Sequence, residues 1–361
     1  PWQPNYIVPE EVEIDLDNLL NNIKMGLKEF YRYIDDLNAI STAAEETFKK
    51  DITAEIIEKQ ALVYYELGLY EEAEGKYKTL RDMESADFSF ASMEKYCNTR
   101  AKMHVKNVYL TGKNISKEAK VTAHHEIKGV IRDLQFLSLA GQTAERLNLM
   151  ASTHKRMSMV AATKAERIKQ YKLSLSYYQQ AMQRMIKDQQ KNGANVNLSY
   201  PLTNAVELSY ILQANGHHGS GVVEKHAYEI YDKNTAIRKL GRELNKLDEQ
   251  KSDDNLNHMD YWNMQKILNI QLCLGVVKNN KNSNAHWRDV VKEARRLWGK
   301  AGSPGNKLAE LEHLKFLIFG LKTAVRSSGE PYLPYKDVMT LDDLNEHLDE
   351  LKKALANTRK K

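Results

Sequence analysis

The sequence contains few prolines and cysteines and no long apolar run. Of its 361 residues, 7 are proline and 2 are cysteine. No segment approaches the roughly 20 consecutive apolar residues that a helix needs to span a bilayer, which disfavours a membrane protein. The first thirty residues also lack a basic stretch followed by an apolar core, so a secretory route finds no support. We expect a cytoplasmic protein that does not bind a membrane.

The cysteines and histidines form no pattern that is typical of a metal site. Cys97 and Cys273 lie far apart, and each stands in an apolar, helical context. We interpret them as buried, inert thiols in a reducing compartment. The adjacent histidine pairs at 124–125 and 217–218 lack a cysteine or an acidic partner at ligand spacing. We therefore expect neither a bound metal nor a cofactor.

Charge and motifs argue against several functional classes. The 53 basic and 48 acidic residues leave a net charge of +5, and the visible basic tail is the short NTRKK at 357–361. This is too little to favour nucleic acid as a partner. The motifs of phosphate-binding loops, zinc proteases, serine hydrolases and protein kinases are absent from the sequence. We expect a protein that is not an enzyme; an enzyme with an unrecognised site is the less favoured alternative.

The distribution of proline predicts a helical fold. Pro201 is the only proline between residues 9 and 304, and proline costs about 3 kcal/mol inside a helix. Apolar residues recur at i, i+3, i+4 and i+7, whereas the alternating segments of strands are missing. The glycine-rich segment NGHHGSGVVEK is interpreted as a flexible loop between helices. We predict an all-α protein with helices near 11–48, 53–67, 70–83, 90–107, 116–139, 143–161, 164–191, 201–214, 222–248, 257–277, 284–299, 305–327 and 341–357.

One stretch has the spacing of a tetratricopeptide repeat, ALVYYELGLYEEAEGKYKTL at 61–80. Ala61 and Ala73 are small where two helices would cross closely, Gly68 lets the chain turn, and the tyrosines would fill the space between the helices. A second, looser unit lies at 174–185. Such helical hairpins stack into a solenoid, so the sequence predicts a tetratricopeptide-like α-solenoid.

The expected solenoid covers residues 51–327. An N-terminal helical segment, 1–50, precedes it, and a linker with an amphipathic helix and a basic tail, 328–361, follows. In that last part, leucines at helical spacing from 341 to 355 form one apolar stripe that must lie on another surface.

Four separated segments resemble one known family, in the family's own order. They are AERLNLMASTHKRMSMVA (144–161), YPLTNAVELSYIL (200–212), DYWNMQKILNIQLCLG (260–275) and WRDVVKEARRLWGKAGSPGNKLAELEHLKFLI (287–318). The family is the tetratricopeptide-repeat sensor domain of bacterial conflict and antiphage systems. It is related to the central regulatory region, also described as TRAF-binding, of the apoptosis signal-regulating kinases. The resemblance covers roughly residues 54–320.

The resemblance implies a non-enzymatic module that senses a signal or holds a partner and controls an effector. The signal could be a nucleotide-derived ligand bound on the concave face of the solenoid. A plain protein–protein interaction adaptor without a small ligand is the alternative within the same fold.

The candidate binding residues lie in three of the four segments. Arg146, Lys155 and Arg156 either line the concave surface and bind phosphate or acidic groups, or Arg146 pairs with a neighbouring helix while the other two are solvated. Asn204 holds an anion at a helix start, or it makes capping or inter-repeat hydrogen bonds. Tyr261 stacks on a base or fills the seam between helices.

Overall fold

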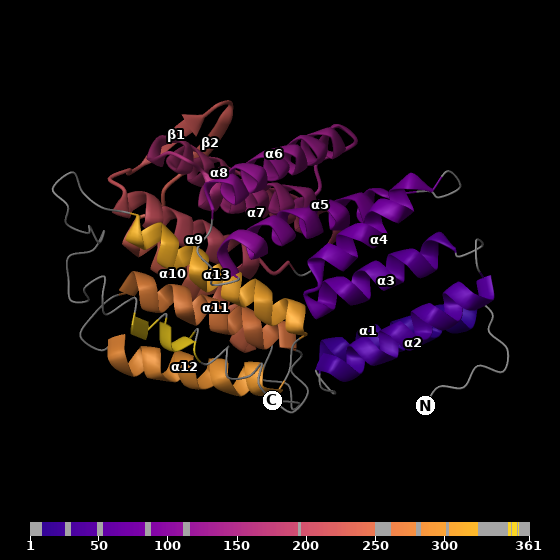
Figure 1. Cartoon of the computed structure of the whole chain (residues 1–361). Coiled ribbons are helices and arrows are strands. Elements are labelled where there is room, and N and C mark those ends of the chain that lie inside the picture. The colour runs from indigo at the N-terminus through magenta and orange to yellow at the C-terminus, as the bar shows by residue number, and fades with distance from the viewer. Residues whose placement is uncertain are drawn as a thin grey trace.

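A computed structural model describes residues 9–25, 30–48, 53–83, 88–110, 116–193, 196–249, 261–278, 283–300 and 303–323, and part of 346–353. In this part of the chain helices predominate, and consecutive helices pack against one another in pairs (Figure 1). The prediction of a helical, tetratricopeptide-like fold is therefore confirmed. Among the described helices, none is long and apolar enough to cross a membrane.

Thirteen α-helices are described. In chain order they are α1 (Pro9–Met25), α2 (Phe30–Phe48), α3 (Ala54–Leu67), α4 (Tyr70–Asp82), α5 (Phe90–Val105), α6 (Lys117–Leu139), α7 (Ala144–Val160), α8 (Lys164–Asn192), α9 (Ser199–Ala214), α10 (Lys233–Glu249), α11 (Tyr261–Lys278), α12 (Ser283–Lys300) and α13 (Pro304–Lys322). A π-helical turn, η1 (Lys106–Leu110), continues α5.

The predicted repeat unit at 61–80 forms the helical hairpin α3–α4. Gly68 ends α3 in the left-handed region, with a φ of 74° that suits glycine. Ala61 and Ala73 are fully buried where the two helices cross, and the ring of Tyr77 is buried beside them. The spacing of small and aromatic residues was thus sufficient to predict this hairpin.

The N-terminal helical segment is a pair of helices, so the single helix predicted over 11–48 is wrong. Helices α1 and α2 pack on each other and on α3. Leu16, Leu37 and Val63, one from each helix, are fully buried in a shared cluster. Lys59 adds an ion pair from α3 to Asp17, with 2.7 Å between Nζ and Oδ2. Because the apolar period continues in both helices, it did not reveal the break between them.

A β-hairpin stands where a flexible loop and the start of a helix were predicted. Strands β1 (Ser220–Val223) and β2 (His226–Glu229) pair antiparallel, and they lie at the upper edge of Figure 1 against α8. The side chain of Gln179 donates to the carbonyl of Glu229 (2.6 Å) and accepts from its N–H (3.0 Å). The prediction failed because these two strands are too short to give an alternating pattern and depend on α8.

Helix α13 begins beside α3 of the first repeat and crosses the middle of the molecule to α9 (Figure 1). It packs against α3, α9 and η1. Ser303 caps α13 and also donates to Glu66 of α3, with 2.6 Å between Oγ and Oε2. Gly305 approaches α3 so closely that a Cβ there would meet the carbonyl oxygen of Tyr65 at 2.6 Å. The end of the solenoid is therefore fastened to its beginning.

The predicted C-terminal helix over 341–357 lies largely outside the described residues. Within it, Leu351 is fully buried. The imidazole of His347 stacks on the indole of Trp287 in α12, with ring centroids 5.2 Å apart. These described positions therefore lie on the solenoid.

Candidate functional site

Helix α7 is buried along most of its length although it carries two arginines, a lysine and a histidine. It contacts α5, α6 and α8. Arg146, His154, Lys155 and Arg156 are each less than a tenth exposed. Buried charges are costly unless they are paired or hydrogen-bonded. The alternative in which Lys155 and Arg156 are solvated is therefore wrong, because neighbouring helices cover both side chains.

Arg146 is used in the packing of helices. Its Nε donates to the Glu94 carboxylate of α5 at 2.6 Å, and its Nη1 donates to the carbonyls of Gly141 (2.7 Å) and Leu137 (3.2 Å). These contacts tie the start of α7 to α5 and to the turn before it. The structure thus places Arg146 in an inter-helix ion pair, away from the cavity described next.

A cavity of about 430 Å³ lies along α7, where its lining runs from Glu145 to Arg156. The residues that line it come from α3, α5, α7, α9, α11 and α13. In this set, α3, α5, α7, α9 and α11 are each the first helix of a pair. The first helices of stacked pairs form the inner surface of a solenoid. Helix α13 encloses the cavity on the remaining side. Lys155, Arg156 and Asn204 are brought together here.

Arg156 faces this cavity with a nearly buried guanidinium. Its Nε donates to the Glu312 carboxylate of α13 at 2.7 Å, and its Nη1 lies 3.3 Å from both Asn98 Oδ1 and Ser152 Oγ. Although burial alone lowers it, the Glu312 carboxylate raises the pKa of Arg156 above its ordinary value. This guanidinium therefore stays charged and connects three helices.

Lys155 points to the α9 side of the same cavity. Its Nζ donates to Asn204 Oδ1 at 2.7 Å and lies 4.8 Å from the centre of the Phe316 ring. Burial lowers the pKa of Lys155, and the carboxylates of Glu207 and Glu312 oppose this effect. The Asn204 amide also donates to the carbonyl of Tyr200 at 2.9 Å. Because Lys155 and Asn204 belong to different repeats, the bond between them is an inter-repeat hydrogen bond, which is one of the two roles expected for Asn204.

An acidic group with its own partners lies behind Lys155. Oε1 of Glu207, which is 1% exposed, lies 2.8 Å from His313 Nε2 and accepts from the Cys273 thiol at 3.3 Å. Burial raises the pKa of this carboxyl, but His313 and Lys155 outweigh the burial and lower it below its usual range. Glu207 therefore carries a negative charge that helps to hold Lys155 protonated.

A third buried cation lines the cavity and was missed in the sequence. Lys102 of α5 lies over two aromatic rings, with Nζ 4.5 Å from the Tyr65 centroid and 5.4 Å from the Tyr70 centroid. Cation–π contacts of this kind stabilise an ammonium group that has lost water. Tyr65 also accepts from the Asn98 amide at 2.9 Å. The only signal in the sequence was the tyrosine spacing of the repeat, which predicts packing but not the lysine that the rings hold.

Carboxamide side chains line much of the remaining wall. They are Asn98, Asn148, Asn204, Gln265, Asn269 and Asn306. The Oδ1 atom of Asn148 is buried without a hydrogen-bond partner among the described residues. A buried acceptor left unpaired costs about 1–3 kcal/mol. The cavity therefore offers both donors and acceptors beside its cations.

Tyr261 begins α11, but its side chain lies outside the described residues. Its predicted stacking or packing role stays a prediction. Among the described residues, no group of three or more histidine, cysteine or acidic side chains is placed to hold a metal ion.

Comparison with known proteins supports part of the expected relationship. The family model described as Tetratricopeptide Repeats-Sensor (TPR-S) matches residues 69–209. No curated protein and no solved structure gives a significant match. The matched range contains α5, α7 and the part of α9 that faces the cavity. Two of the segments that resemble the family in sequence, 260–275 and 287–318, lie beyond this range. Residues 69–209 are thus similar to a sensor domain built from tetratricopeptide repeats, which indicates a sensor or regulatory role.

Proposed function

We propose that this protein is a non-enzymatic sensor whose central cavity binds an anionic, nucleotide-derived ligand and thereby controls an effector protein. The observation that carries the proposal is the placement of Lys102, Lys155 and Arg156 as buried cations on the wall of one cavity. Guanidinium and ammonium groups bind phosphate. The carboxamides beside them suit the donor and acceptor edges of a base.

The ligand acts by competing with α13 for Arg156. In the structure the Glu312 carboxylate occupies the Nε side of this guanidinium. Nη2 of Arg156 has no hydrogen bond to a described residue, so it is the position at which a phosphate oxygen first binds. A phosphate that binds both Nη2 and Nε of the Arg156 guanidinium displaces the Glu312 carboxylate. Helix α13 then shifts relative to α7. A small movement at one repeat accumulates along a solenoid, which carries the signal to the effector.

The resemblance to a sensor family supports a proposal for the cellular setting. The segments 144–161 and 200–212 resemble sensor domains of bacterial conflict systems, and the match to the sensor family covers the first of these. We place the protein in the cytoplasm, in a bacterial antiviral defence system, with a separate effector as its partner.

Thermal unfolding in the presence of nucleotides and cyclic oligonucleotides tests this function. A ligand at one hundred times its dissociation constant stabilises the protein by about 2.7 kcal/mol. Glu312→Gln removes the competing carboxylate charge and is expected to increase the affinity of the ligand. Glu94→Gln is the matched control. Glu94 pairs with Arg146, which lies on α7 like Arg156, but neither Glu94 nor Arg146 lines the cavity. This variant should leave the affinity unchanged.

The alternative is the adaptor without a small ligand. No stabilisation by any member of the panel, together with a stable partner complex that Glu312→Gln does not affect, would establish the adaptor and remove the small-ligand proposal.

A further inference from the structure

A second hollow, of about 750 Å³, lies between the β-hairpin, α8 and α10. It shares no lining residue with the cavity of the proposed sensor site. Met182 and Ile186 of α8 line it together with Leu198 and Leu202 at the start of α9. Ile186 is 40% exposed, so an apolar side chain remains open to a partner at this place. We call this hollow the hairpin groove.

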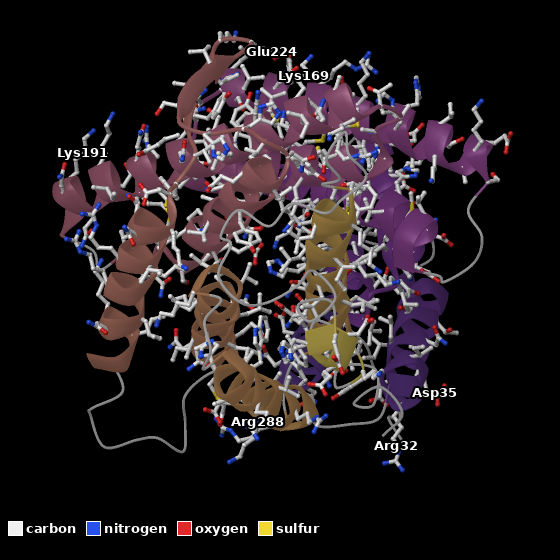
Figure 2. The ribbon with its side chains drawn as sticks, turned by 90° about the vertical axis from the view of Figure 1, so that its left-hand side faces the viewer. Arg32, Asp35, Lys169, Lys191, Glu224 and Arg288 are labelled. Carbon is white, nitrogen blue, oxygen red and sulfur yellow. The ribbon has the colours of Figure 1, made fainter. Side chains whose placement is uncertain are left out.

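Both walls of the hairpin groove are held in place. On one side, the two hydrogen bonds between Gln179 and the backbone of Glu229 fix β2 on α8. Lys169 adds an ion pair of 2.9 Å to Glu224 at the turn of the hairpin, and Figure 2 shows these two residues next to each other. On the other side, Glu243 of α10 accepts from the N–H of Leu198 at 2.8 Å. The groove therefore exists before any partner binds.

The groove carries an excess of positive charge. Its basic residues are Lys225 on the hairpin and Lys239, Arg242 and Lys246 on α10. The acidic residues that line it are Glu229 and Glu243. Glu243 is 4% exposed and is already used by the Leu198 N–H and by Lys246 at 3.4 Å. An apolar floor between basic walls fits a partner that is apolar at its centre and acidic at its edges.

We propose that the hairpin groove is a docking site for an acidic amphipathic helix of a partner protein. The lining residues of α8 run from Ser176 to Ile186, a distance of about 15 Å along the helix, which three turns of a partner helix would cover. An aliphatic side chain of that helix packs on Ile186, and its carboxylates face Arg242 and Lys225. The proposal goes beyond the sensor function and does not depend on it.

Fluorescence anisotropy with a labelled model peptide tests the proposal on the full chain. The probe is a helical peptide of about 18 residues, with leucine along one face and glutamate on both sides of it. A second peptide with glutamine in place of glutamate is the charge control. We expect saturable binding of the acidic peptide that weakens with salt and that Arg242→Glu reduces about tenfold.

Arg238→Glu is the matched control variant, because Arg238 is exposed on the same helix outside the groove. It makes the same change in net charge and should leave peptide binding within about twofold of wild type. Ile186→Ser removes the apolar contact from an exposed position and should also weaken binding. Circular dichroism and thermal unfolding establish that each variant is folded.

Three results would overturn the docking site. They are no binding of the acidic peptide at about 1 mM, equal loss with Arg238→Glu and Arg242→Glu, and equal binding of the glutamine peptide. Tighter binding of a short single-stranded DNA that depends on Arg242 would assign the groove to nucleic acid instead. Because the groove and the sensor cavity are separate, a failure here leaves the nucleotide results unaffected.

Discussion

Arg156 and Glu312 are separated by 156 residues in the chain and form a buried ion pair, with 2.7 Å between Nε and Oε1. Their side chains are 8% and 6% exposed. This pair joins α7 at the centre of the solenoid to α13, which comes from its end. We infer that the same contact stabilises the position of α13 beside α7 and is the contact with which a ligand must compete.

Breaking this pair on one side should be costly. Arg156→Gln leaves the Glu312 carboxylate buried without its cation, and we expect the free energy of unfolding to fall by about 3–5 kcal/mol. The double variant Arg156→Gln/Glu312→Gln removes both charges and should recover much of this loss. Urea denaturation of the wild type, both single variants and the double variant gives the coupling energy. Additive single effects would mean that the two residues do not stabilise each other.

Local patterns predicted the helices of this fold much better than its site. Ala61, Gly68 and Ala73 act within one hairpin, so their spacing alone was sufficient. The burial of Lys155 and Arg156 depends on α13, whose position no local pattern reveals. Met150 and Met157 showed the apolar period of α7, but this period did not reveal that the two cations between them in the sequence are also covered.

Packing of α13 on α3 should depend on the absence of a side chain at Gly305. An added Cβ would lie 2.6 Å from the Tyr65 carbonyl oxygen and 2.8 Å from that of Glu66. Because backbone atoms cannot move away as a flexible side chain does, we expect Gly305→Ala to lower the free energy of unfolding by about 1–3 kcal/mol. Urea denaturation measures this change.

Gly75 provides the control for the same substitution. It lies within α4, and an added Cβ would have no atom within 4 Å. Gly75→Ala should therefore raise the free energy of unfolding by about 0.5–1 kcal/mol, because alanine is the better helix former. Equal effects of the two variants would contradict the close approach at Gly305.

Stability should fall in mild acid because His154 is buried. Burial lowers the pKa of His154 to about 4, whereas an unfolded histidine has a pKa near 6.5. Below pH 6.5 the unfolded chain therefore takes up a proton that the native state does not bind until about pH 4. The contribution of His154 to the free energy of unfolding is therefore fully present above pH 6.5 and is lost as the pH falls toward 4. The expected loss from this residue between pH 7 and pH 5 is about 2 kcal/mol.

Urea denaturation across this range, with His154→Gln as the comparison, isolates the contribution. His104, His217 and His226 also have pKa values lowered by burial and act in the same direction. The variant should be less stable at pH 7, since the stacking of His154 on Tyr177 is lost. Its dependence on pH should nevertheless be weaker by nearly one proton. An unchanged dependence would mean that His154 titrates normally in the native state.

The two thiols should be unreactive in the native protein, as the sequence predicted. Burial raises the pKa of Cys97 to about 12, and burial together with the neighbouring Glu207 carboxylate raises the pKa of Cys273 well above its ordinary value. The thiolate is the form that attacks a disulfide, so little of it is present at pH 8.

Ellman's reagent measures this reactivity directly. In native buffer we expect negligible release of the coloured product over minutes, and in guanidinium chloride we expect both thiols to react. The reactivity of Cys273 also reports on the position of α13, because Cys273 donates to the same Glu207 oxygen that contacts His313 of α13. Because Gly305→Ala should weaken the packing of α13 on α3, we expect Cys273 to react faster in that variant than in the wild type, while Cys97 does not. Fast reaction of Cys273 in the wild type would contradict its burial.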